Sequence, residues 1–454
     1  MTTSTPADHK AREAVRRQHD QTLFVEAGAG TGKTTELVMR VLELVAHGQL
    51  PAMASLAAIT FTENAAAELR TRIREALEDG AEGRHRDRTF TVTEQALLAT
   101  ALEEIDDAAI TTLHGFATRV LQDAPLEAGL PPGFAVNDAI RSQLEAAARW
   151  RSFLDDLLDD DSVAEHLLAA LTLDLKTEKL REIADAFTGS WDLLQHRPFS
   201  PVPLPAVDVS SVLDPLRRAA AYLTDAPAGD GLTAHLETVV VPFIDALEGL
   251  DDRMDLIEAL QRTKVKSSAG LAPAWKGRKP EIVAILLEAH EASTQLVGDI
   301  GTAATETLCA RLQDFVLAEA CRRQREGSLT FHDLLVLTRD VLRRDRGVRD
   351  RLHARYPVLL IDEFQDTDPL QVEIACLIAA DCVDVPAEDW ADMAVGGGRL
   401  FFVGDAKQSI YRFRRADVQL YRAVGERFSA GTTTLSVNFR SVPAVVSTVN
   451  AVFE

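Results

Sequence analysis

A short glycine-rich segment near the N-terminus constrains this chain more than any other feature. Residues 27–34 read AGAGTGKT, which fits the phosphate-binding pattern G-x-x-x-x-G-K-[ST] except that Ala27 replaces the first glycine. An apolar run over Thr22–Glu26 precedes it, and apolar residues at helical spacing follow over Thr34–Val45. A strand, a glycine-rich turn and a helix in this order let backbone N–H groups and a helix N-terminus bind phosphate oxygens. The segment therefore predicts a nucleotide site.

We expect a continuous set of loop residues to hold the phosphates. The set comprises Ala27, Gly28, Ala29, Gly30, Thr31, Gly32, Lys33, Thr34 and Thr35. Within it, Lys33 is expected to reach the β- and γ-phosphates, and Thr34 to offer its hydroxyl to Mg²⁺. An ordinary glycine-rich turn is the alternative, but such a turn has no need of Gly-Lys-Thr at this spacing.

A pair of acids later in the chain completes the expected chemistry. Asp362 and Glu363 follow the four-residue apolar run Val358–Ile361, which predicts a buried strand. A phosphate loop needs a carboxylate at the end of a neighbouring strand, so Asp362 is expected to hold Mg²⁺. Glu363 is expected to act as general base for the attacking water. Two solvated acids that end a strand are the alternative.

Strands and helices alternate in two parts of the chain. Leu56–Phe61 predicts a strand and Asn64–Leu77 a helix, and strand patterns return at Leu400–Val403 and Thr433–Val437. Such alternation predicts an α/β fold with a parallel sheet covered on both faces. From about residue 131 to 307 the periodicity is mainly helical, which indicates a large helical insertion in the sheet domain.

Composition excludes little. The net charge of the 454 residues is −22, which by itself disfavours non-specific nucleic-acid binding. A protein that grips a single strand, however, needs only a local groove of basic and aromatic side chains. We find no apolar stretch of about 18 residues and no order of segments typical of a secretory signal, and the cysteines stand alone. We therefore expect a cytoplasmic protein without a membrane partner.

Six further segments carry a resemblance to a known family. They are TFTENAA (60–66), TLHGF (112–116), LTFHDLL (329–335), DEFQDT (362–367), VGDAKQSIYRFR (403–414) and VNFRS (437–441). In sequence and order they resemble the motifs of superfamily 1A DNA helicases of the UvrD/Rep type. The sequences of the phosphate loop and of TLHGF, together with the long insertion, are most similar to those of the RecB/AddA helicase–nuclease branch. The resemblance implies a RecA-like P-loop NTPase that uses ATP and Mg²⁺ for 3′-to-5′ DNA unwinding, coupled to single-strand translocation, in repair or recombination.

The resemblance also implies roles for individual side chains. Gln408 matches a glutamine that contacts the γ-phosphate, and Arg440 matches an arginine that stabilises the transferring phosphoryl group. With Lys33 and Glu363 they form the expected catalytic set, although Arg440 alone would be taken for a surface arginine. The expected DNA contacts are Thr60, Phe61, Thr62, His114, Tyr411, Phe413 and Arg414. Core packing is the alternative for the two phenylalanines, and a structural role is the alternative for the histidine.

Two features stay open. The family's glutamine that reads the adenine edge is missing here, and His9, Arg12 or Gln18 are the candidates to replace it. A basic, turn-rich run within 262–280 either contacts duplex DNA or is a solvated loop. Its candidate side chains are Lys264, Lys266, Trp275, Lys276, Arg278 and Lys279.

The resemblance implies a division of the chain. Residues 1–130 and 311–441 are expected to form two parts of one RecA-like motor domain, 131–310 the helical insertion, and 442–454 the start of a second motor domain. Because that second domain is lacking, we expect an N-terminal portion with an incomplete, weakly active ATP site. Expected partners are single-stranded and forked DNA and a helicase or nuclease subunit.

Three functions remain in competition at this point. The chain is part of a 3′-to-5′ helicase, or a module that binds ATP and DNA without unwinding, or a P-loop ATPase or kinase unrelated to DNA. The aromatic residues Tyr411 and Phe413 after Gln408 disfavour the third.

Overall fold

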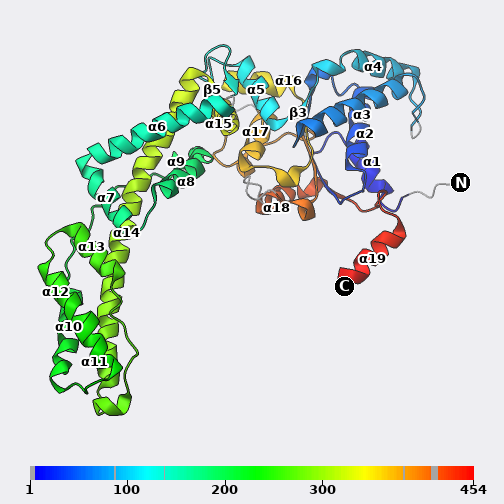
Figure 1. Ribbon diagram of the computed structural model, residues 1–454. Coiled ribbons are helices and arrows are strands. Elements are labelled where there is room, and N and C mark those ends of the chain that lie inside the picture. The colour runs from blue at the N-terminus through cyan, green and yellow to red at the C-terminus, as the bar shows by residue number, and fades with distance from the viewer. Residues whose placement is uncertain (1–5, 86–87, 137–138, 382–383, 411–417, 454) are drawn as a thin grey trace. The chain divides into compact units, whose positions relative to one another are not determined.

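The chain divides into two compact units. Unit 1 comprises Met1–Val136 and Gln324–Glu454, and unit 2 comprises Asn137–Arg323 (Figure 1). The computed structural model describes residues 6–85, 88–136, 139–381, 384–410 and 418–453, without the side chains of 139–145. Within these ranges, no helix has the length and apolarity that a membrane crossing requires.

Unit 1 is built on a six-stranded sheet whose strand pairs are all parallel. Its strands are β1 (Leu23–Ala27), β2 (Leu56–Thr60), β3 (Ala109–Thr112), β6 (Val358–Ile361), β7 (Leu400–Gly404) and β8 (Thr432–Leu435). The spatial order is β3-β2-β6-β7-β1-β8. The expected α/β fold with a RecA-like parallel sheet is confirmed.

This order decides which loops meet. Since the strands run in one direction, their carboxyl ends lie at a single edge of the sheet, where ligands of such folds bind. β7 lies between β1 and β6. The loops after these three strands carry the glycine-rich segment, the acid pair and Gln408, so three segments far apart in sequence come together at one edge.

Helices cover the sheet. Those of unit 1 are α1 (His9–Arg17), α2 (Lys33–Ala46), α3 (Glu63–Ala81), α4 (Val92–Glu103), α5 (Leu113–Asp123), α15 (Phe331–Arg344), α16 (Arg346–Arg355), α17 (Pro369–Ala379), α18 (Val418–Arg427) and α19 (Pro443–Phe453). Helices α2, α3 and α4 pack together, and α15 packs against α5 and α17 (Figure 1). A buried apolar cluster joins α2, α3 and α4 to the strands, with Val25 and Leu360 among its members. Burial of this surface is the main source of stability for the sheet.

A second, aromatic cluster fixes the backbone beside the acid pair. The rings of Phe364 and Phe402 lie 4.6 Å apart between centroids, and the rings of Phe24 and Tyr421 lie 4.9 Å apart. Phe24 also meets Phe364 edge-on at 5.8 Å. Since Phe364 directly follows Glu363, this packing anchors the turn after β6.

Unit 2 is helical. Its helices are α6 (Ala139–Asp159), α7 (Asp161–Thr172), α8 (Thr177–Thr188), α9 (Trp191–Leu194), α10 (Ser210–Ala220), α11 (Gly231–His235), α12 (Val241–Gly249), α13 (Arg253–Arg262) and α14 (Lys279–Glu326). Figure 1 shows the long α14 running beside the shorter helices of this unit. Two apolar clusters form its core. The short strands β4 (Ala135–Val136) and β5 (Ser328–Leu329) pair in unit 1.

One aromatic side chain of the basic run lies inside unit 2. Trp275 is only 4% exposed, and its Nε1 donates a hydrogen bond to Asp230 Oδ1 at 2.8 Å. A buried indole with a bonded N–H is a core residue. Trp275 is therefore excluded as a DNA contact, and only the basic side chains of this run remain candidates.

Candidate nucleotide-binding site

The glycine-rich loop adopts the geometry that phosphate binding requires. β1 ends at Ala27 and α2 begins at Lys33, with Gly30 and Gly32 at φ angles of +77° and +85°. A Cβ atom at Gly30 would lie 2.6 Å from Asn438 Oδ1, so no side chain fits there. Thr31 closes the loop, since its hydroxyl donates to Gly28 O at 2.8 Å. The loop thus ends at the N-terminus of a 14-residue helix, where orphan N–H groups favour an anion.

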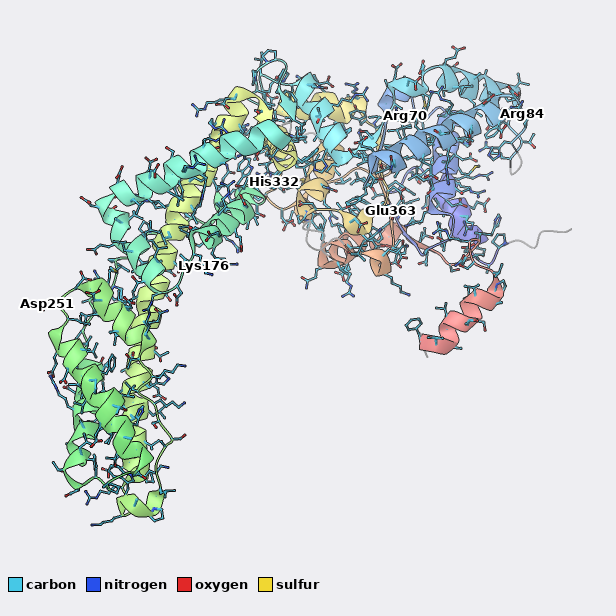
Figure 2. All side chains as sticks on the ribbon, in the orientation of Figure 1. Arg70, Arg84, Lys176, Asp251, His332 and Glu363 are labelled. Atoms are coloured by element: carbon cyan, nitrogen blue, oxygen red, sulfur yellow. The ribbon has the colours of Figure 1, made fainter. Side chains whose placement is uncertain are left out.

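Lys33 and Glu363 meet across the sheet edge. Lys33 Nζ donates to Glu363 Oε2 at 2.7 Å, although the residues are 330 positions apart in sequence. The Lys33 side chain is 11% exposed and that of Glu363 is 34% exposed. Figure 2 marks Glu363 in the middle of unit 1. The expected phosphate-binding cation and the expected base are therefore adjacent.

The acid pair sits in a tight, strained turn. Asp362 N donates to Ile59 O at 2.9 Å, which continues the pairing of β6 with β2. Glu363 then takes the left-handed conformation, with φ +51° and ψ +44°. Few residues other than glycine adopt it, because it brings Cβ close to the carbonyl oxygen. Such strain recurs at functional sites, where the surrounding packing enforces it.

Two carboxyl groups of this turn have displaced pKa values. Burial, and next the charge of Glu363, raise the pKa of Asp362 to about 6. Burial and the charge of Glu363 likewise raise the pKa of Asp366 to about 6. Negative charge is thus concentrated around Glu363, and a bound cation would offset it.

The loop after β7 joins the same network. Gln408 Nε2 donates to Asp405 Oδ2 at 2.8 Å, and Asp405 N donates to Gln365 Oε1 at 2.9 Å. Gln365 in turn donates to Glu363 at 2.7 Å. Gln408 is therefore linked to the acid pair by a series of hydrogen bonds.

The segment after β8 lies against the phosphate loop. Phe439 N donates to Gly30 O at 2.8 Å, and a Cβ atom at Gly30 would come within 2.7 Å of Arg440 Cβ. The Asn438 side chain accepts the N–H groups of Arg440 and Ser441 and so shapes the turn. Arg440 is exposed beside the loop, where a guanidinium can approach a phosphoryl group.

A buried ion cluster of Asp8, Arg12 and Glu36 holds the segment after β8 in place, and the sequence did not predict it. Arg12 is 5% exposed and donates to Asp8 through Nε and Nη2, to Glu36 through Nη1 and to Thr31 O through Nη2, at 2.8–3.0 Å. Asp8 Oδ2 also accepts the N–H groups of Ser436 and Val437 at 2.9 Å. Arg12 is the one candidate for the missing glutamine that touches the phosphate loop, but these partners take all but one of its five N–H groups.

Four of the expected DNA contacts lie at or just after the ends of β2 and β3. Phe61 is partly exposed, and Thr60, at 4% exposure, donates its hydroxyl to Thr62 O at 3.1 Å. The Thr62 hydroxyl caps α3 by accepting Ala65 N. His114 lies in the first turn of α5, after Thr112 caps that helix. Tyr411, Phe413 and Arg414 lie outside the described residues.

Phe331 adds an aromatic ring that was not expected at this surface. It begins α15, is 63% exposed, and meets His114 edge-on with 5.2 Å between the ring centroids. Its neighbour His332 is labelled in Figure 2. The available signal in the sequence was a phenylalanine within a segment of the resemblance, LTFHDLL (329–335).

The fold and the site together define a P-loop nucleotide-binding domain of the RecA-like kind. The phosphate loop after β1 and the acidic turn after β6 lie at the same edge of the sheet, with β7 between the two strands. The family model of the UvrD/REP helicase N-terminal domain matches residues 7–429 of this chain. The chain therefore belongs to that family, and the resemblance seen in its motifs is confirmed.

Curated relatives point to the same branch. The chain is 26% identical to an ATP-dependent helicase/nuclease subunit from Ligilactobacillus salivarius, with 99% of this chain and 38% of the relative covered. It is 28% identical to the RecBCD enzyme subunit RecB of Escherichia coli, with 95% of this chain and 38% of the relative covered. An ATP-dependent helicase/nuclease subunit from Desulforudis audaxviator is 28% identical, with 97% and 39% covered. The chain thus spans about 38% of the length of such relatives.

Proposed function

We propose that this chain binds Mg²⁺–ATP and forms the nucleotide-binding wall of a DNA helicase motor that moves 3′ to 5′ along single-stranded DNA. The observation that carries this proposal is the contact of Lys33 with Glu363 at 2.7 Å, at the shared carboxyl edge of β1 and β6. Family membership and the names of the relatives support DNA as the substrate.

The proposed chemistry assigns each side chain a task. Residues 27–35 cradle the phosphates, and Lys33 exchanges Glu363 for the β- and γ-phosphate oxygens when ATP binds. Glu363, thereby released, accepts a proton from the attacking water. Gln408 and Arg440 approach the γ-phosphate from the loops after β7 and β8, and Arg440 neutralises charge as the phosphoryl group transfers.

The acids fit a magnesium ion that is held jointly with the nucleotide. Mg²⁺ prefers oxygen ligands and is commonly bound by one or two carboxylates together with substrate phosphates. Thr34 and Asp362 offer a hydroxyl and a carboxylate, and the negative surroundings of Asp362 favour a cation. In the part of the chain that the structure describes, no three His, Cys, Asp or Glu side chains form a metal cluster. This agrees with a shared site rather than a protein cage.

DNA would bind beside the nucleotide, along the ends of β2 and β3. Phe61 and Phe331 offer aromatic faces for bases, and His114 lies between them in the sequence and against Phe331 in space. Thr60 and Thr62 shape the backbone before α3 and remain candidates for phosphate contact. Tyr411, Phe413 and Arg414 complete the proposed set, and the cytoplasm is the proposed compartment.

The relatives suggest the wider setting. Forked DNA as a substrate, a partner helicase or nuclease subunit, and a role in repair or recombination all belong to this proposal. So does the assignment of 1–130 and 311–441 to one motor domain, 131–310 to an insertion and 442–454 to the start of a second motor domain. A module that binds ATP and DNA without unwinding is the second candidate.

One assay series distinguishes these functions. ATP hydrolysis by the full 454-residue chain is measured with and without single-stranded DNA, beside strand separation of a forked duplex. Hydrolysis that DNA stimulates, and that Lys33→Ala and Glu363→Gln each abolish, supports the motor. Binding of both ligands without unwinding supports the module. Hydrolysis that survives both substitutions would refute the assigned site.

A further inference from the structure

Gln365 is a buried amide at the centre of the site, and both of its ends are bonded. It is 3% exposed. Its Nε2 donates to Glu363 Oε2 at 2.7 Å, and its Oε1 accepts Asp405 N–H at 2.9 Å. The Ser409 hydroxyl donates to its backbone oxygen at 3.1 Å. Gln365 therefore bridges the turn after β6 and the loop after β7.

The chemistry of the partners fixes the orientation of this amide. The end that accepts a backbone N–H must be the carbonyl oxygen, so the end that faces the carboxylate must be the NH₂ group. Glu363 Oε2 thus receives two donors, Lys33 Nζ and Gln365 Nε2, each at 2.7 Å. When phosphate takes Lys33 away, Gln365 is the donor that still orients the carboxylate.

The end of β7 presses closely on this amide. A Cβ atom at Gly404 would lie 2.7 Å from Gln365 Oε1 and 3.1 Å from Gln365 N. Only glycine permits this approach, and the contact leaves the amide little room to move independently of β7. A shift of the loop after β7 would therefore be transmitted to Glu363.

Further hydrogen bonds of Asp405 extend this network into the loop after β7. The Asp405 carboxylate accepts Lys407 N–H at 3.1 Å and Gln408 Nε2 at 2.8 Å. Lys33, Glu363, Gln365, Asp405 and Gln408 thus form one series from the phosphate loop to the loop that precedes the proposed DNA-contacting aromatics. At Asp405 the series passes from the backbone N–H, which bonds Gln365, to the carboxylate, which bonds Gln408, so loss of the Gln365 amide would disconnect Glu363 from the loop after β7.

We propose that Gln365 is the positioning residue for Glu363, and that it couples the nucleotide state at Lys33 to the loop after β7. The inference rests on the proposed function and adds to it a residue that does not itself contact nucleotide. Spatial continuity alone does not establish coupling, so the test must measure it.

The first test needs no hydrolysis. Hydrogen exchange of the Asp405 amide is followed by NMR in the full chain, with and without Mg²⁺–AMPPNP, for wild type, Q365M and the control Q371M, whose half-buried glutamine lies on α17. Nucleotide is expected to slow this amide about tenfold in wild type and Q371M, equivalent to about 1.4 kcal/mol. In Q365M the Asp405 amide is expected to exchange faster even without nucleotide, and its exchange rate should no longer change when nucleotide is added. A response in Q365M equal to that of wild type would overturn the inference.

The second test separates binding from catalysis. Q365M is expected to lower the single-turnover rate of ATP hydrolysis roughly 10- to 100-fold, the scale of a misplaced general base, with AMPPNP affinity unchanged. A normal rate in Q365M contradicts the inference. Failure of wild type to bind AMPPNP, or binding that K33A leaves intact, would instead refute the proposed function.

Discussion

The guanidinium of Arg12 lies on the ring of Phe439, with its central carbon 4.8 Å from the ring centroid. Phe439 remains 60% exposed, and its backbone N–H is bonded to the phosphate loop at Gly30. The Arg12 guanidinium covers one face of the Phe439 ring. The remainder of the ring is exposed to solvent and lies beside the phosphate loop. A base attached to bound phosphates would have this ring within reach.

Stacking on Phe439 predicts weak discrimination between nucleotide bases. Every base has a π-face, and all but one of the five Arg12 N–H groups are engaged by Asp8, Glu36 and Thr31. We expect dissociation constants for ATP and GTP within about tenfold of each other, since sites without edge contacts reject analogues poorly. Fluorescence titration with labelled ATP and GTP measures both.

Substitution of the ring tests the same prediction. Phe439→Ala should weaken ATP and GTP binding alike, by about 1–3 kcal/mol, the usual value of base–aromatic stacking. The control is Phe453→Ala, which removes another ring that is 85% exposed on α19. Selective loss of ATP binding in Phe439→Ala would show that the base edge is read after all.

Asp8 is predicted to stabilise the segment after β8. Its carboxylate bonds Arg12 and the N–H groups of Ser436 and Val437. Asp8→Asn should lower the free energy of unfolding by about 3 kcal/mol, as for a buried pair that loses one partner. Glu13→Gln is the control, because the Glu13–Arg17 pair is exposed and 3.5 Å long. Chemical denaturation measures both, and equal effects would contradict the prediction.

The Asp8 contribution should also depend on pH in a defined direction. Burial acts to raise the pKa of Asp8, but hydrogen bonds from Arg12 and from the backbone at 437 and 436 lower it below 3.8 overall. A carboxyl with a lowered folded pKa adds stability above its unfolded value and loses it as pH falls through the folded value. The stability difference between wild type and Asp8→Asn should therefore be constant well above pH 3.8 and shrink below it.

Glycine and alanine at position 363 provide a test of backbone strain. With φ at +51°, an alanine there keeps the strain that a glycine relieves. Glu363→Gly should therefore be more stable to unfolding than Glu363→Ala, by up to about 1 kcal/mol, while both abolish hydrolysis. At exposed Glu13 within α1 the order should reverse, because alanine favours a helix by about 1 kcal/mol. The same order at both positions would argue against strain.

Local pattern predicted the strands, the helices and the glycine-rich turn of unit 1 well, but not the residues at which they end. β2 was expected to include Phe61 and ends at Thr60, because the Thr62 hydroxyl caps α3 and starts that helix at Glu63. The order of the parallel strands is set by packing within the sheet. This order brings Lys33, after β1, and Glu363, after β6, to the same edge. The sequence predicts a role for each of them, whereas their contact becomes visible only in the fold, where β7 lies between β1 and β6.

Long-range contacts were beyond the sequence pattern. The sequence offered Arg12 only as a candidate to replace the missing glutamine, and the fold shows it buried between Asp8, Glu36 and Phe439. Trp275 stands in a basic run, yet Asp230, 45 residues away, accepts its N–H inside the core of unit 2. In both cases the deciding partner is distant in sequence, and periodicity carries no information about it.

The exposed ring of Phe331 is predicted to bind single-stranded DNA together with His114. The two rings lie 5.2 Å apart edge-on, near the end of β3 and the start of α15. Phe331→Ala should weaken binding of an oligothymidylate by about 1–3 kcal/mol, the contribution of one stacked base. Phe331→Trp should retain binding, because it keeps an aromatic face. The matched surface control is Val92→Ala on α4, where the side chain is 84% exposed.

The salt dependence distinguishes stacking from a charge effect. Phosphate contacts release counterions, so their loss reduces the slope of log affinity against log salt. Loss of a stacked base weakens binding by the same factor at every salt concentration. Fluorescence anisotropy of labelled oligothymidylate across a salt series should therefore give parallel lines for wild type and Phe331→Ala. Equal affinity of Phe331→Ala and wild type would remove Phe331 from the DNA surface, and a changed slope would show that the substitution disturbs a phosphate contact nearby.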